Sequence, residues 1–221
     1  MTAVLVAAGS STRMGFDKLS FDLGGETVLE RSVRAFDECP EVDELVIVTG
    51  ASDENAQRAA ARCKKPVRLV KGGSTRAESA RSGVAAAHGR LVAVHDAARP
   101  FVSQSVIADT IAAAARCGAA APAVPVKDTI KTVAEDGAVT GTPDRSTLRA
   151  VQTPQVFEAD LLKASLQSAL ENEVPVTDDC SAVERLGKVV YLIDGDEENL
   201  KITTPVDLVI AEAILAEREG R

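Results

Sequence analysis

The feature that most constrains the fold is a series of short apolar runs separated by stretches of helical periodicity. The runs occupy residues 3–8, 45–48, 67–70, 91–94 and 119–126. Apart from Arg68, these runs are apolar instead of alternating with polar residues, which is typical of strands buried on both faces of a parallel sheet. Parallel neighbours need a crossover connection, and the helical stretches supply it. The pattern predicts a doubly wound α/β fold with one mostly parallel sheet.

The spacing of apolar residues and two capping signals locate the helices. Helices are expected over residues 27–39, 53–64, 103–117 and 158–170, with a shorter one that ends at residue 186. Thr75 and Glu78 have the spacing of a capping box, so a helix begins just after Thr75. Thr204 and Pro205 combine an N-cap with proline at the first helical position, which starts the last helix. A late strand is predicted over residues 189–193.

The periodicity changes after the fifth run. Residues 127–133 alternate, residues 135–137 form a Glu-Asp-Gly turn signal, and residues 138–142 can return as a second strand. We therefore expect a β-hairpin arm over residues 127–145, inserted into a single domain that spans residues 1–221. A hairpin that projects from a parallel sheet is suited to dimerisation.

Charge and composition exclude several classes of partner. The formal net charge is −8 and aromatic residues make up 3% of the chain, which disfavours nucleic acid and anionic membranes as partners. No apolar run approaches the ~20 residues that span a bilayer. The chain leads directly from Met1 into the first strand, which leaves no signal peptide. The cysteines are far apart and lack a Cys-x-x-Cys pair, so we expect reduced thiols in a cytoplasmic protein.

The first strand is followed by a small polar loop with two cations. Gly9 opens the loop, and Arg13 and Lys18 follow close together. Glycine lets a backbone approach a ligand closely, successive loop N–H groups form an anion-binding concavity, and the two cations match a polyphosphate. The spacing is neither that of a P-loop nor Gly-x-Gly-x-x-Gly. The loop is interpreted as a triphosphate cradle; the alternative is a strand-to-helix turn with two solvated cations.

A second glycine loop precedes the helix that begins after Thr75. Gly72 and Gly73 lead into this helix, on which Arg76, Ser79 and Gly83 share one face. Ala80 and its apolar neighbours are expected to take the core side. Two glycines before a helix N-terminus that carries Arg and Ser indicate a site for a polar ligand. The alternative is a capped surface helix with an exposed arginine.

The fourth strand ends in the segment of residues 95–100, His-Asp-Ala-Ala-Arg-Pro. Ligands of open parallel sheets bind beyond the carboxyl ends of the strands, where this segment lies. Asp96 is a candidate for binding sugar hydroxyls or a metal ion. Arg99 is better explained as a loop-stabilising partner of Asp96 than as a catalytic residue, and His95 as a structural histidine.

Several motifs occur in the order found in one enzyme family. They lie at residues 6–15 with Lys18, 72–79, 95–100, 126–131, 144–145, 152–155, 177–178 and 199–203. Together they resemble the 2-C-methyl-D-erythritol 4-phosphate cytidylyltransferase (IspD) family over nearly the whole chain. The first loop is shared by many nucleotidyltransferases, whereas its combination with His-Asp-Ala-Ala-Arg-Pro and Thr-Pro-Gln is much more specific.

The resemblance implies a cytidylyl transfer in isoprenoid precursor biosynthesis. The phosphate of methylerythritol phosphate attacks the α-phosphorus of CTP, pyrophosphate leaves, and 4-diphosphocytidyl-2-C-methyl-D-erythritol forms. Converging negative charge calls for cations and for Mg²⁺, held mainly by the CTP phosphates, and no metal site of the protein's own is implied. Arg13 and Lys18 correspond to family residues that contact the triphosphate, and Lys201 to one that contacts the α-phosphate. Arg145 completes the catalytic candidates.

The resemblance also implies the binding residues. Those for CTP are Ala7, Ala8, Gly9, Gly73, Ser79, Asp96 and Ala97. Those for methylerythritol phosphate are Asp96, Thr129, Arg145 and Thr177. In the family the arm positions matching Thr129 and Arg145 reach the site of the partner subunit, so a homodimer is implied.

Two departures and two rival functions accompany the resemblance. Glu198 stands where the family often has aspartate, and Lys18 is followed by Leu-Ser instead of the frequent Gln-Tyr or Gln-Phe. One rival function is a ribitol 5-phosphate cytidylyltransferase, which the polyol pocket would distinguish. The other is a non-catalytic nucleotide-binding regulatory domain, which would not need to keep Arg13, Lys18 and Lys201.

Overall fold

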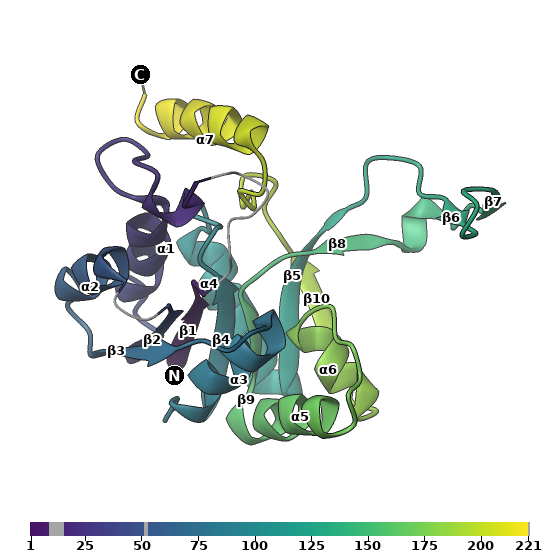
Figure 1. The fold of residues 1–221 in the computed structure, drawn as a ribbon, viewed down its shortest axis with the longest axis horizontal. Coiled ribbons are helices and arrows are strands. Elements are labelled where there is room, and N and C mark those ends of the chain that lie inside the picture. Colours follow the sequence, from purple (N-terminus) through teal and green to yellow (C-terminus); the bar gives the residue numbers. More distant parts are fainter. Residues whose placement is uncertain (9–15, 51–52, 221) are drawn as a thin grey trace.

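The computed structural model describes residues 1–8, 16–50 and 53–220, and a central sheet dominates it (Figure 1). Its strands are β1 (Thr2–Val6), β2 (Glu44–Thr49), β3 (Val67–Lys71), β4 (Leu91–Asp96), β5 (Ala119–Pro125), β8 (Arg149–Val151), β9 (Gln155–Glu158) and β10 (Tyr191–Asp194). The order across the sheet is β10-β5-β9-β4-β1-β2-β3, with β8 beside β5.

Most strands of the sheet are parallel, as predicted. β1 pairs in parallel with both β2 and β4, β2 with β3, and β5 with β10. β9 is antiparallel to β4 and β5, and β8 is antiparallel to β5. The antiparallel strands follow the arm, because a chain that goes out and comes back re-enters the sheet in the opposite direction.

Helices cover both faces of the sheet (Figure 1). They are α1 (Val28–Asp37), α2 (Glu54–Ala61), α3 (Arg76–Ala85), α4 (Gln104–Cys117), α5 (Ala159–Glu171), α6 (Asp179–Arg185) and α7 (Pro205–Arg218). Leu5 of β1 belongs to the core with α1, α2, α4 and α7, whereas Val4 belongs to the core with α3, α5 and α6. Successive strand residues point to opposite faces, so an uninterrupted apolar strand feeds two cores. The predicted α/β class is confirmed.

The segment between β5 and β8 extends away from the sheet (Figure 1). It carries β6 (Thr132–Val133) and β7 (Val139–Gly141), which pair antiparallel with each other. Gly137 turns between them with a φ of +84°, which glycine adopts readily. Val133 and Val139 are 61% and 60% exposed, so the tip of the arm has no core of its own.

The structure also tests the predicted helix starts, the late strand and the state of the cysteines. Thr75 caps α3 and Thr204 starts α7 with Pro205 in its first turn, as predicted. The predicted late strand is β10, displaced by two residues at its start. All four cysteines are free. Among the described residues, no helix combines the length and the apolar character needed to cross a membrane.

Candidate active site

A polar cavity opens at the carboxyl ends of β1 and β4. These strands are neighbours, yet the chain continues from β1 toward β2 and from β4 toward β5, in opposite directions across the sheet. Such a switch point creates a crevice where ligands of open α/β sheets bind. The cavity measures about 380 Å³. It is lined by Val6, Ala8, Lys18, Leu19, Gly73, Ser74, Thr75, Arg76, Ser79, Asp96, Ala98 and Lys201.

The glycine loop before α3 forms one wall. Thr75 Oγ1 accepts from the N–H of Glu78 at 3.1 Å, and Ser79 Oγ accepts from the N–H of Gly73 at 3.1 Å. A Cβ on Gly72 would collide with Cβ of Ala8 and lie 2.9 Å from Oγ of Ser79. The loop therefore needs glycine there to pass close to the end of β1.

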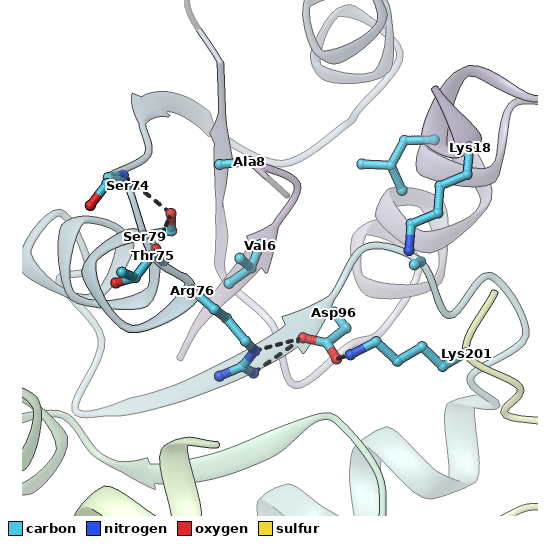
Figure 2. A pocket seen from close by; sticks show the side chains of 12 residues that line it. Val6, Ala8, Lys18, Ser74, Thr75, Arg76, Ser79, Asp96 and Lys201 are labelled. Carbon is cyan, nitrogen blue, oxygen red and sulfur yellow. Dashed lines mark hydrogen bonds and ion pairs between the residues drawn. The ribbon is translucent and has the colours of Figure 1, made fainter. Parts of the chain in front are cut away.

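The expectation for the polar face of α3 was wrong in one respect. Ser79 and Gly83 do share a face with Arg76, but both are buried. A Cβ on Gly83 would collide with side-chain atoms of Val4 and Val48. Gly83 thus lets α3 pack closely on the sheet, whereas Arg76 and Ser79 line the cavity (Figure 2).

Asp96 lies between two cations at the end of β4 (Figure 2). Nε of Arg76 donates to Oδ1 of Asp96 at 3.1 Å, and Nζ of Lys201 donates to Oδ2 at 2.5 Å. Burial alone would raise the pKa of Asp96, but the charges of Arg76 and Lys201 hold it well below its usual value. Asp96 is therefore ionised, and one carboxylate holds two cations from distant parts of the chain.

Asp179 is a site residue that sequence reasoning missed. It begins α6, its side chain is 1% exposed, and its Oδ2 accepts from Nη2 of Arg76 at 2.9 Å. Its Oδ1 is buried without a hydrogen-bond partner. Burial raises the pKa of Asp179, whereas the charge of Arg76 opposes that shift. The only signal in the sequence is an acidic pair at the start of a short helix, which usually indicates capping.

The segment that carries Lys201 is clamped to the β4 loop. Asn199 is fully buried and its Nδ2 donates to the carbonyl of Thr153 at 2.9 Å. Nη1 of Arg99 donates to the carbonyl of Asn199 at 2.6 Å, and the N–H of Ile202 donates to the carbonyl of Ala98 at 2.9 Å. These bonds fix the backbone on both sides of Lys201.

Lys18 joins this segment from the opposite wall of the cavity. It begins the short 3-10 helix η1 (Lys18–Ser20), and its Nζ donates to the carbonyl of Ile202 at 2.8 Å. Lys18 and Lys201 therefore belong to one cavity although the sequence separates them widely (Figure 2).

The two other candidates of the 95–100 segment have structural roles. His95 is fully buried between the carbonyl of Arg99 and Oγ1 of Thr153, at 3.1 and 3.0 Å from its ring nitrogens. Burial lowers the pKa of His95 to about 4, so the ring is neutral. The expected Asp96–Arg99 pair is replaced, because Asp96 bonds Arg76 and Lys201 while Arg99 bonds the Asn199 carbonyl.

The remaining candidates fall into three groups. Ala7 is buried beside the lining, and Ala97 is fully buried with its carbonyl accepting from Oγ of Ser32 at 2.8 Å, so neither lines the cavity. Thr129, Arg145 and Thr177 are exposed and do not line it either. Gly9 and Arg13 lie outside the described residues.

Glu198, which departs from the family pattern, points away from the cavity. Its Oε2 accepts from Nε of Arg218 on α7 at 2.8 Å. The longer side chain therefore ties the Lys201 segment to the last helix, and the cavity lining does not include it.

No group of three or more metal-binding side chains occurs among the described residues. Asp96 is the single carboxylate in the described lining, and it already holds two cations. This donor set fits a Mg²⁺ ion that a substrate brings on its phosphates, since Mg²⁺ commonly binds one or two carboxylates together with substrate phosphates.

Comparisons with known proteins agree with this geometry. The sequence model of the family described as 2-C-methyl-D-erythritol 4-phosphate cytidylyltransferase matches residues 1–217. A relative of that name from Symbiobacterium thermophilum is 47% identical over 98% of this chain and 93% of its own length. The chain belongs to this cytidylyltransferase family.

Solved structures support the same assignment. The 4-diphosphocytidyl-2C-methyl-D-erythritol synthase from Anaerococcus prevotii is 33% identical, with a TM-score of 0.88 over 97% of this chain and 95% of its own. The 2-C-methyl-D-erythritol 4-phosphate cytidylyltransferase from Thermus thermophilus is 36% identical, with a TM-score of 0.80 over 96% and 97% of the two chains. As a member of the cytidylyltransferase family, this enzyme transfers the cytidylyl group of CTP to methylerythritol phosphate and forms 4-diphosphocytidyl-2-C-methyl-D-erythritol.

Proposed function

We propose that the cavity at the ends of β1 and β4 is the site of this transfer, and that its cations bind the reacting phosphates. Lys18 and Arg13 bind the β- and γ-phosphates of CTP, and Lys201 binds the α-phosphate. The negative charge that builds on the α-phosphorus and on the departing pyrophosphate is then compensated by fixed cations. The attacking phosphate of methylerythritol phosphate is already ionised, so no general base is required.

One observation carries this proposal: cations converge on a single cavity in a chain with a net charge of −8. Lys18, Arg76 and Lys201 come from three separate segments and all line that cavity. Anionic ligands are not attracted by the surface as a whole, so a local cluster of positive charge marks where they bind.

The wall of small residues is suited to the nucleoside. Ala8 and Gly73 leave room for a flat ring, and Ser79 carries a hydroxyl that the loop holds in place. The family resemblance adds Ala7, Gly9 and Ala97 to the residues assigned to the nucleoside. We assign cytosine and ribose to these residues, with backbone groups selecting the cytosine N4 amino group over the uracil O4.

Asp96 and the arm are assigned to the second substrate. Asp96 accepts hydrogen bonds from the polyol hydroxyls of methylerythritol phosphate, and Thr177 contacts the same substrate from the start of α6. Thr129 and Arg145 lie on the arm, away from the cavity of their own chain. They serve the site of a partner subunit in a homodimer, where the Arg145 guanidinium neutralises the attacking phosphate.

Mg²⁺ enters this proposal on the CTP phosphates, and Asp96 is the single carboxylate in the described part of the lining that could face it. The ion would withdraw electron density from the phosphoryl oxygens and offset the charge of the triphosphate. The four free thiols agree with a cytoplasmic location, where glutathione and thioredoxin keep cysteines reduced.

The proposal is tested by measuring pyrophosphate release from CTP and Mg²⁺, with methylerythritol 4-phosphate and with ribitol 5-phosphate as acceptors. Release with the first acceptor alone is expected. Release with ribitol 5-phosphate alone would move the polyol assignment to the other acceptor. CTP binding without release from either acceptor would contradict the catalytic assignment of the cavity.

Shared sites are tested by mixing two inactive variants. In the first variant, Arg145→Ala disables the arm and leaves the cavity intact. In the second variant, Lys201→Ala disables the cavity and leaves the arm intact. Mixed dimers of the two variants contain one site that has both an intact arm and an intact cavity, so about half of the sites in each mixed dimer recover activity. No recovery on mixing, with mixed dimers demonstrated by mass spectrometry, would contradict the assignment of Arg145 to the partner's site.

A further inference from the structure

We propose that Arg76, held from behind by Asp179, is a positioning residue that fixes the Asp96 carboxylate for the polyol of methylerythritol phosphate while Lys201 turns to the substrate phosphate. This inference rests on the proposed role of Asp96. It gives Arg76 and Asp179 a part in recognising the acceptor, although the family resemblance assigns neither of them to catalysis or substrate binding.

The two oxygens of Asp96 are divided between two cations. Oδ1 accepts from Arg76 and Oδ2 from Lys201. Arg76 lies in the first turn of α3, and a helix holds its Cα firmly. Lys201 lies on a segment without helix or strand, and its side chain is 39% exposed. Of the two partners, Lys201 is therefore the one free to exchange Asp96 for a phosphate.

Arg76 is the bridge between two carboxylates. Its Nη2 lies 2.9 Å from Oδ2 of Asp179 and 3.1 Å from Oδ1 of Asp96. A guanidinium has donors in a rigid planar fork, so contact with one carboxylate fixes the direction of the contact with the other. The contact with buried Asp179 thereby sets the orientation in which Arg76 meets the Asp96 carboxylate.

Asp179 has no other visible reason to be charged and buried. Its side chain is 1% exposed, and its Oδ1 has no hydrogen-bond partner. Its backbone N–H, which donates to Oε1 of Gln155 at 3.1 Å, would be equally satisfied with any side chain at this position. A buried carboxylate is costly unless an opposite charge compensates it, and Arg76 is that charge. Asp179 remains a buried carboxylate, despite the free energy needed to remove it from water, because it fixes Arg76.

Charge balance explains how Lys201 can leave Asp96. The two carboxylates and the two cations form a neutral set when all are ionised. When the Lys201 ammonium moves to a phosphate of the substrate, Arg76 still compensates Asp96, so the carboxylate stays ionised and oriented. Without the fork of Arg76, Lys201 would be the remaining direct partner of Asp96 and would be harder to detach.

Conservative variants test the bridge. Arg76→Lys keeps the charge but removes the fork, and Asp179→Asn keeps the shape but removes the second carboxylate. Each is expected to raise the KM for methylerythritol 4-phosphate at least tenfold, while the Kd for CTP, measured without the acceptor, changes less than threefold. The matched controls are Arg81→Lys on α3 and Glu184→Gln on α6, both exposed positions, which leave both constants unchanged.

A double variant separates positioning from a structural effect. If Asp179 acts through Arg76, the KM for methylerythritol 4-phosphate in Arg76→Lys/Asp179→Asn equals that of the more affected single variant. Independent structural damage would instead multiply the two effects and would weaken CTP binding in parallel. Multiplied effects, or an unchanged KM in folded Arg76→Lys, would overturn the inference. Should Asp179→Asn fail to fold, Arg76→Lys decides alone.

Asp96→Asn distinguishes this inference from the proposed function. If the KM for methylerythritol 4-phosphate rises in Asp96→Asn but is unchanged in Arg76→Lys and Asp179→Asn, the role of Arg76 and Asp179 is wrong. The assignment of Asp96 to the acceptor then still holds. An unchanged KM in Asp96→Asn would remove the assignment of Asp96 to the polyol, and the bridge with it.

Discussion

The Lys201 ammonium lies 2.5 Å from Oδ2 of Asp96, so the cation proposed for the α-phosphate is held at the end of β4 before any substrate arrives. Asp96 is buried and ionised, whereas the Lys201 side chain is 39% exposed. Lys201 is thus held at the cavity by the carboxylate that we assign to the acceptor polyol. Under the proposed roles, a substrate phosphate that binds Lys201 must compete with Asp96 for its ammonium group. The affinities for CTP and for the acceptor would then both depend on this ion pair.

Removing Lys201 should abolish most of the activity and little of the stability. Lys201→Met is expected to lower kcat/KM by ~10²–10³-fold, the range seen when one donor to a developing negative charge is lost. Asp96 keeps Arg76 as its partner, so the melting temperature changes little. Steady-state kinetics and thermal unfolding measure the two effects, with the exposed Lys188→Met as the matched control. A loss of kcat/KM in Lys188→Met as large as that in Lys201→Met would contradict the assignment of Lys201.

Lys18 and Arg13 should behave alike, because both are assigned to the triphosphate. Lys18→Ala removes the contact of Nζ with the Ile202 carbonyl and a positive charge from the cavity. Turnover of Lys18→Ala and of Arg13→Ala should fall far more than the melting temperature. Pyrophosphate release and thermal unfolding are the measurements. A melting temperature that falls in step with activity would show that these cations serve the fold instead of the reaction.

Stability should fall as the pH drops below neutrality because His95 is buried. Its pKa is lowered to about 4 from the value of 6.5 usual for histidine. Between these two pH values His95 is protonated in the unfolded chain and neutral in the folded chain. The stabilisation is complete above about pH 6.5 and is lost between pH 6.5 and 4, at about 1.4 kcal/mol per pH unit for one proton. Urea unfolding at pH 7.5, 6 and 5 measures this slope.

Substitution of His95 provides the control for that slope. His95→Gln lowers the stability at neutral pH, since the bonds to Arg99 and Thr153 weaken, but the pH dependence between pH 6.5 and 4 should flatten. The exposed His88→Gln should retain it. A His95→Gln protein with the slope of the unmodified enzyme would show that other groups cause the pH dependence.

Close packing of α3 on the sheet predicts a sensitive glycine. Gly83→Ala would bring a Cβ into Val4 and Val48, so α3 must shift outward or the core must repack. Overpacking of this kind typically costs ~1–3 kcal/mol. Urea unfolding measures the loss, and Ser82→Ala, one position earlier on the same helix, is the control. A Gly83→Ala variant as stable as the control would mean that α3 accommodates the methyl group without strain.

Local sequence patterns were sufficient to locate most helices and strands and to select Asp96 as a candidate. The apolar runs predicted β1, β2, β4 and β5, because a strand buried on both faces is largely apolar. β3 was also located, although it is the partly exposed edge strand and contains Arg68. Thr75 predicted the start of α3, because a capping hydroxyl satisfies N–H groups within its own turn. Asp96 was a candidate because it directly follows a buried strand, and residues there meet at one edge of a parallel sheet.

Such patterns could not predict which charged residues meet when distant segments pack on the sheet. The sequence paired Asp96 with Arg99, its near neighbour, whereas the fold pairs it with Arg76 and Lys201. It also gave no sign that Asp179 would be buried behind Arg76. Which charges meet depends on how α3, α6 and the segment before α7 pack on the sheet.

The sequence alone therefore determined the α/β class and most strands and helices, because each depends on residues close together in the chain. The tertiary structure decided that Gly83 belongs to the core, that β9 runs antiparallel, and that one carboxylate is shared by two cations. These features arise from contacts between residues far apart in the chain. Their free energies depend on distance and burial, which only the folded protein defines.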